Sequence, residues 1–154
     1  MFDKSKFFKA ITDMGANVAK STAKYIPASL SEDKRFSNAY AACLGLLVCA
    51  DLEVEANETI SAIGFMQNDF CLKDRGLVLS TLNFYGQFIS DLSDSFSSQT
   101  DYLLKKAKII QEHIAVELSP SYKNDLKNLC NSLVGPNANQ QERQVYAEIM
   151  AAMS

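Results

Sequence analysis

Apolar side chains recur at the three- and four-residue spacing of an α-helix along almost the whole chain. The stretch Phe36, Tyr40, Cys43, Leu44, Leu47 is one such stripe. Alternating Val/Ile/Thr-rich runs and turn dipeptides such as Asn-Gly, which indicate strands and hairpins, are missing. At 154 residues the chain is the size of one ordinary domain. The pattern therefore predicts an all-α fold, a compact bundle of about seven helices.

Residues that typically begin or end helices, such as capping residues and proline, divide the chain into seven expected helices. The expected helices run over about 3–25, 32–50, 56–69, 73–92, from Ser98 through Leu118, 119–133 and from 139 to the end. Pro27 ends the first, which predicts an amphipathic basic helix over 1–27 and a helical domain over 28–154. Ser98–Asp101 and Asn139–Glu142 have capping-box spacing. The side chains expected to face the core include Ile60, Ile63 and Met66 in the third helix and Leu103, Ala107, Ile110, Ile114 and Leu118 in the fifth.

Charge is distributed unevenly along the chain. The net charge is -3, which argues against nucleic-acid binding, since nucleic-acid binders normally carry a basic stripe. Residues 1–30 contain five lysines and two aspartates, a charge of +3, so the remainder carries -6. Two interpretations of residues 1–25 stay open. Their lysines and Phe2, Phe7, Phe8, Ile11 and Met14 suit a peripheral contact with anionic lipid, and they equally suit a helix packed on the bundle.

Composition places the chain in the cytoplasm and argues against an enzyme. The longest apolar stretch, 39–50, is too short to cross a bilayer, and the first ten residues are too charged for a signal peptide. Cys43, Cys49, Cys71 and Cys130 form no CxxC pair and are expected to be reduced thiols. The single histidine, His113, leaves too few partners for a nucleophilic triad, although His113 and Glu117 have a spacing that can place two ligands on one helix face.

Four carboxylates gather between the second and third predicted helices: Asp51, Glu53, Glu55 and Glu58. Like charges this close repel one another, and solvent, a helix N-terminus or a hard cation such as Ca²⁺ can offset the repulsion. An EF-hand does not fit, because Ala56 and Ala62 replace its glycine and its final glutamate. The alternative is that the acids only decorate the first turn of a helix.

A second inter-helix segment matches the first at an offset of 84 residues, so that Glu142 corresponds to Glu58 and Ala138 to Val54. Each segment joins an apolar helix to an amphipathic one. This spacing predicts a pseudo-repeated arrangement of helix pairs.

These residues resemble the TerB (tellurite-resistance) family and its wider TerB-like superfamily. The likeness rests on Cys49-Ala50-Asp51, Val54, Glu58 and Ile63-Gly64-Phe65-Met66, and it extends over about 36–153. It implies an all-helical bundle with a divalent-cation site built from the acids of two motifs. It also implies a cytoplasmic adaptor in tellurite, phage or stress resistance, working at the inner membrane with a TerC-like membrane protein.

The chain departs from the family pattern at two places. Leu52 replaces the glycine after the aspartate, which predicts a different turn there, and Gly135-Pro136 replaces the second Asp-Gly pair. Asp51, Glu58 and Glu142 carry over by position, and Glu53 and Glu55 are possible substitutes. Two functions follow as hypotheses: an adaptor whose acidic cluster binds Ca²⁺ or a similar cation, or a metal-free helical module that recognises a protein partner.

Overall fold

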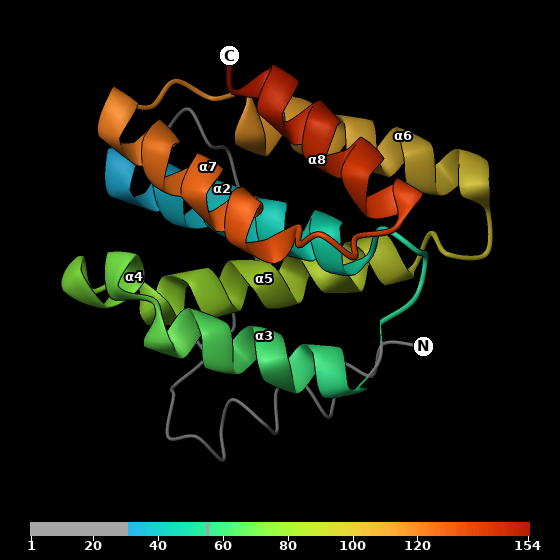
Figure 1. The fold of residues 1–154 in the computed structure, drawn as a ribbon, viewed down its shortest axis with the longest axis horizontal. Helices are drawn as coiled ribbons and strands as arrows, with labels where there is room; N and C mark the ends of the chain where they lie inside the picture. Colours follow the sequence, from blue (N-terminus) through green and yellow to red (C-terminus); the bar gives the residue numbers. More distant parts are fainter. Residues whose placement is uncertain (1–30, 55) are drawn as a thin grey trace.

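The computed structural model describes residues 31–54 and 56–154 (Figure 1). Over this range it is all-helical, without a strand, which confirms the predicted fold class. The helices are α2 (Glu32–Val48), α3 (Ala56–Asn68), α4 (Phe70–Asp74), α5 (Val78–Ser93), α6 (Gln99–Ile109), a π-helical turn (Ile110–Ile114), α7 (Pro120–Leu133) and α8 (Gln140–Ala152). The predicted helix over 1–27 lies outside the described residues. None of the described helices is long and apolar enough to cross a membrane.

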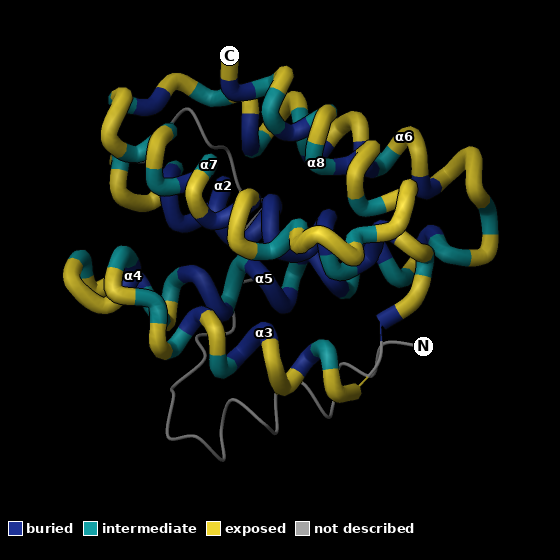
Figure 2. Tube along the Cα trace, viewed as in Figure 1, coloured by how far each residue is buried: buried dark blue, intermediate teal, exposed yellow. Residues whose placement is uncertain are grey.

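Helix α2 is the centre of the bundle. Its N-cap Ser31 accepts a hydrogen bond from the Lys34 amide at 3.3 Å, and Glu32 and Asp33 favour its first turn. Every residue from 36 to 47 is buried, so the helix is enclosed on all sides (Figure 2). The hydroxyls of Ser37 and Thr81 lie 2.8 Å apart and satisfy each other inside the contact between α2 and α5.

The other helices cover α2 in two layers (Figure 1). Helices α3 and α5 lie on one side of it, and α7 and α8 lie on the other. The loop that follows α2 and the loop that precedes α8 reach the same end of the bundle. Two segments that are far apart in the sequence thereby become neighbours.

The helix expected over 73–92 is two helices. Gly76 follows the end of α4 and has φ +66, a left-handed conformation. Glycine adopts this conformation without strain because it has no Cβ atom. Asp69 caps α4 through a 2.9 Å hydrogen bond from the Cys71 amide to its Oδ1 atom. The sequence analysis placed no turn here, although a glycine commonly follows the end of a helix.

The expected core face of the fifth helix is correct at its C-terminal end, where Ile114 and Leu118 are buried, and wrong in its first turns, where Leu103 and Ala107 are exposed. Tyr102, Lys106 and Ile109 face inward, whereas Leu103 is 45% exposed. The Lys106 ammonium reaches Glu148 on α8 at 3.0 Å, and this ion pair lets a lysine occupy an inward position. The α-helix also ends earlier than expected and continues as the π-helical turn.

One expected core residue of α3 faces outward. Ile63 and Met66 are buried as predicted, but Ile60 is 59% exposed and Thr59 is buried in its place. The inward stripe of α3 therefore runs through Thr59, Ala62, Ile63 and Met66.

Candidate acidic pocket

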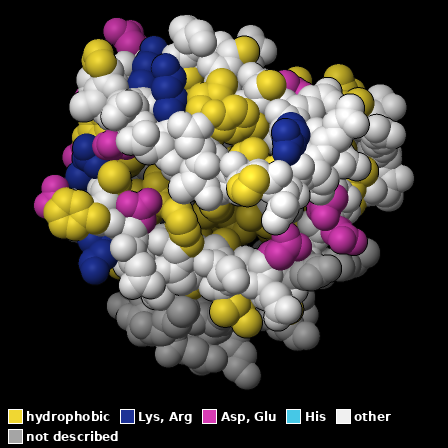
Figure 3. Space-filling view, viewed as in Figure 1, with side chains coloured by type: hydrophobic (Ala, Val, Ile, Leu, Met, Phe, Trp, Pro, Cys, Tyr) yellow, Lys and Arg dark blue, Asp and Glu magenta, His cyan; other side chains and the backbone are white. Residues whose placement is uncertain are grey.

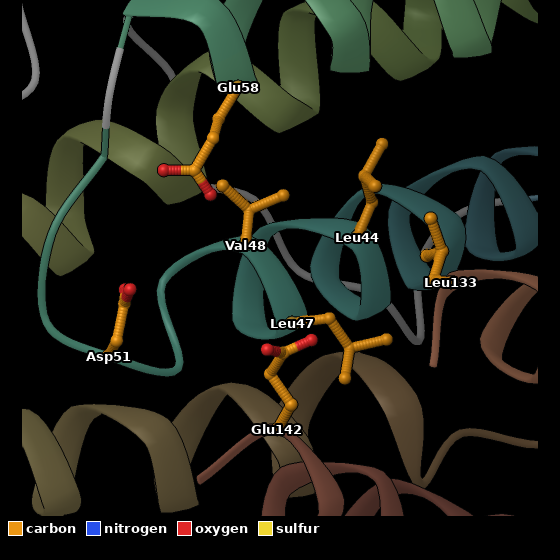
Figure 4. Close-up of a pocket in the computed structure, with 7 residues that line it drawn as sticks. All are labelled: Leu44, Leu47, Val48, Asp51, Glu58, Leu133 and Glu142. Atoms are coloured by element: carbon orange, nitrogen blue, oxygen red, sulfur yellow. The ribbon is translucent and has the colours of Figure 1, made fainter. Parts of the chain in front are cut away.

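Three carboxylates from different parts of the sequence line one small pocket of about 150 Å³. Asp51 follows α2, Glu58 lies in the first turn of α3, and Glu142 lies in the first turn of α8. Their carboxylates are directed toward a common space beside the end of α2 (Figure 4). The apolar wall consists of Leu44, Leu47, Val48 and Leu133. Figure 3 shows acidic side chains beside a hollow with hydrophobic side chains in it.

The loop after α2 brings Asp51 to the pocket through a tight turn. The Leu52 amide donates to the Cys49 carbonyl at 2.9 Å, and the Glu53 amide lies 3.4 Å from the Asp51 Oδ1 atom. Leu52 has φ +64, the left-handed conformation that glycine adopts without strain. The expectation that leucine implies a different turn is therefore wrong: Leu52 itself takes the left-handed conformation.

The loop before α8 fixes Glu142 from the other side. The Asn139 Oδ1 atom accepts a 2.8 Å hydrogen bond from the Glu142 amide and caps the helix, as its spacing predicted. Arg143 donates to the carbonyls of Ala138 at 3.0 Å and Pro136 at 3.1 Å, so this guanidinium stabilises its own loop. Glu58 and Glu142 both lie in the first turn of a helix, where the helix dipole favours a negative charge.

The negative charge at this end also affects buried groups beside the pocket. Burial, followed by the charges of Glu58 and Asp51, raises the pKa of the Cys49 thiol. Burial and then the neighbouring Cys49 and Glu58 raise the pKa of the Tyr85 hydroxyl. Of the residues that line the pocket, none is basic. The pocket is thus a negatively charged hollow with an apolar wall.

The structure brings together three of the five predicted ligands: Asp51, Glu58 and Glu142. Glu53 is exposed and does not line the pocket, and Glu55 lies outside the described residues. In the part of the chain that the structure describes, no three His, Cys, Asp or Glu side chains lie close enough to hold a bare metal ion. Hard carboxylate oxygens around a space of this size suit a cation that keeps part of its water shell.

A second cavity of about 430 Å³ adjoins the acidic pocket and shares Asp51 with it. Its lining combines amide side chains with the buried Lys106 side chain. The residues come from the loop after α2, α6 and α8: Ala50, Leu52, Gln99, Tyr102, Leu103, Lys106, Gln141, Gln144 and Val145. The Tyr102 hydroxyl donates to the Cys49 carbonyl at 3.1 Å and ties α6 to the same loop. Sequence reasoning missed this cavity, because an inward lysine on an amphipathic helix has no distinguishing spacing.

Comparisons of this chain with protein-family models, with curated proteins and with solved structures find no match.

Proposed function

We propose that this chain is a non-catalytic, cytoplasmic helical adaptor of the TerB-like kind that binds a divalent cation, Ca²⁺ foremost, in the pocket of Asp51, Glu58 and Glu142. The observation that carries the proposal is the convergence of these three carboxylates on one pocket. They are the three positions that the family resemblance carries over. Their meeting also supports a pseudo-repeat, since the loops after α2 and before α8 contribute one motif each.

Electrostatics supports a cation in this pocket. Carboxylates that share a small space repel one another, and a divalent cation between them turns that repulsion into attraction. Asp51 and Glu142 would hold the ion from the two loops, with Glu58 above them, through oxygen ligands and retained water. Such an ion would tie the loop after α2 to the N-termini of α3 and α8. A partner, such as a TerC-like membrane protein in a stress response, would then recognise the ordered end of the bundle.

Thermal unfolding with EDTA, and then with millimolar Ca²⁺ or Mg²⁺, tests the proposal. A cation at about a hundred times its dissociation constant adds about 2.7 kcal/mol to the free energy of unfolding, a shift of several degrees. We expect Asp51→Asn and Glu142→Gln to abolish the shift. Glu53→Gln is the matched control, because Glu53 lies on the same loop and does not line the pocket. An equal shift in all three variants would contradict the pocket as the binding site.

A metal-free interaction module is the second candidate. It is favoured by the neutral character of the second loop, where Asn137, Asn139, Gln140 and Gln141 surround the single acid Glu142. The absence of a close ligand trio among the described side chains points the same way. This function predicts no stabilisation by any cation, and a partner that binds equally well in EDTA.

A further inference from the structure

The second cavity has the size and the mixed lining of a site for a small organic molecule. Its volume of about 430 Å³ falls within the range of about 300 to 1,000 Å³ that such sites usually have. One wall is a single face of α6 and another is a single face of α8, because the lining residues on each helix are three or four positions apart. The loop after α2 supplies the other lining residues.

Lys106 is the lining residue that most strongly indicates a ligand. Its side chain is only 7% exposed, and among the described residues its ammonium has one hydrogen-bond acceptor, the Glu148 Oε1 atom at 3.0 Å. An ammonium carries three N–H donors, whereas a buried charge normally has its hydrogen-bonding capacity matched. Glu148 does not line the cavity, so its carboxylate leaves that space to a ligand. A ligand carboxylate would accept from the two remaining donors in charge-assisted hydrogen bonds.

Asp51 brings the opposite charge to the same cavity. In the part of the chain that the structure describes, it forms no ion pair, and its Oδ1 atom accepts one long hydrogen bond, 3.4 Å from the Glu53 amide. Tyr102 lies near both charges, because its hydroxyl donates to the Cys49 carbonyl and the Lys106 nitrogen is 6.0 Å from its ring centroid. Two opposite charges that do not pair with each other are complementary to a molecule that carries both signs.

We propose that this cavity binds a short free peptide of two or three residues. The C-terminal carboxylate of the peptide accepts from Lys106, and its N-terminal ammonium donates to Asp51. Because both charges lie near Tyr102, only a short peptide can place its two termini on them. The proposal does not depend on a cation in the acidic pocket.

The rest of the lining matches the middle of such a peptide. Primary amides both donate and accept hydrogen bonds, as peptide N–H and C=O groups require, and three of them line the cavity: Gln99, Gln141 and Gln144. The apolar lining residues give a peptide side chain a surface to pack on: Ala50, Leu52, Leu103 and Val145. A single amino acid has no peptide group for the glutamines to bind, so a peptide uses this lining more completely.

Isothermal titration calorimetry of the full chain in EDTA tests the proposal, with glycyl-leucine, alanyl-leucine and leucyl-leucine at millimolar concentration as probes. We expect at least one of them to bind with one site per chain. Glycyl-leucinamide lacks the carboxylate and N-acetyl-glycyl-leucine lacks the ammonium, so each should bind at least about tenfold more weakly than glycyl-leucine. EDTA removes divalent cations, so the result is separate from the test of the cation site.

Variants of the lining locate the binding site. Lys106→Met should weaken binding at least about tenfold, and Gln144→Ala should weaken it severalfold. The matched controls are Lys108→Met and Gln140→Ala, because Lys108 and Gln140 are exposed on the same helices and do not line the cavity. Gln144 is itself exposed, so its truncation leaves the fold intact even if Lys106→Met disturbs it.

Four results would overturn the proposal. The first is that none of the three dipeptides binds. The second is that the amide or the acetylated analogue binds as tightly as glycyl-leucine, which would show that a terminal charge is not recognised. The third is that Lys106→Met and Gln144→Ala both bind like the natural chain. The fourth is that Glu58→Gln alone abolishes binding, which would place the peptide ammonium in the acidic pocket instead.

Discussion

Asp51 and Glu142 come from opposite ends of the described chain and line the same pocket. Each is held by a capping-type hydrogen bond of its own loop: the Asp51 Oδ1 atom accepts from the Glu53 amide, and the Glu142 amide donates to Asn139. Their proximity follows from the packing of α8 against α2, because Asp51 lies on the loop that follows α2 and Glu142 lies in the first turn of α8. The two loops can therefore respond together to anything that neutralises the pocket.

Without a divalent cation, relieving the repulsion in this pocket should stabilise the protein slightly. Asp51→Asn keeps an oxygen that can accept from the Glu53 amide and removes one negative charge. We expect the free energy of unfolding at low salt to rise by less than about 1 kcal/mol, as for other exposed charge pairs. The gain should disappear in molar NaCl, which screens the charges. Urea denaturation at the two salt concentrations measures it, and a loss of stability at low salt would contradict the repulsion.

The left-handed conformation of Leu52 makes this position sensitive to side-chain shape. Leu52→Ile conserves volume but places a β-branched residue at φ +64, which is more strained than leucine there. We expect the free energy of unfolding to fall by more than about 1 kcal/mol. Leu133→Ile is the control, because Leu133 lies in α7 and tolerates the same exchange with a smaller loss. Equal losses in denaturant unfolding would show that backbone strain at Leu52 is unimportant.

The Lys106–Glu148 pair should respond unequally to removal of its two partners. The Lys106 side chain is 7% exposed and that of Glu148 is 34% exposed. Glu148→Gln leaves a buried ammonium without its charged partner, so we expect a loss of about 2 kcal/mol. Lys106→Met keeps the apolar stem and leaves a carboxylate that water can reach, so we expect a loss below about 1 kcal/mol. Chemical denaturation of both variants checks the order, and the reverse order would contradict this account.

His113 should make the protein less stable in mild acid. Its ring packs edge-on against Phe88 with the ring centroids 4.9 Å apart, and burial lowers its pKa, an effect that the nearby Glu112 and Asp91 charges only partly offset. The unfolded chain therefore takes up the proton first as pH falls, and stability decreases from about pH 6.5 down to the folded-state pKa. Below that value the loss stays constant.

Unfolding measured between pH 7 and pH 5 in the natural chain and in His113→Gln tests this effect. The variant should lose the part of the pH dependence that belongs to the histidine. The same slope in both proteins would show that His113 does not contribute to acid sensitivity.

The sequence predicted the start of a helix correctly where a capping residue marked it. Ser98 and Asn139 begin helices where their spacing indicated, because each side chain accepts a hydrogen bond from an amide within one turn. Helix α7 begins at the Ser119-Pro120 pair as expected, with the proline in its first turn and no side-chain cap hydrogen bond from Ser119. The family resemblance and the offset between two loops, rather than local signals, grouped Asp51, Glu58 and Glu142, and the structure places all three on one pocket. The sequence analysis failed at Gly76 and Ile60, where the helical period alone does not say where a helix turns or which side faces the core.

What the sequence determined by itself is the α-helical state of the chain, since the apolar period and the capping residues act over a few positions. Only the tertiary structure decided that Lys106 faces inward, that Leu52 adopts a left-handed turn, and that three distant carboxylates share a pocket. The physical reason is that the inward lysine and the shared pocket depend on partners from other helices, and that the conformation of a single loop residue has no periodic signal in the sequence. Glu148 compensates the buried lysine, and the packing of α3 and α8 around the end of α2 brings the acids together.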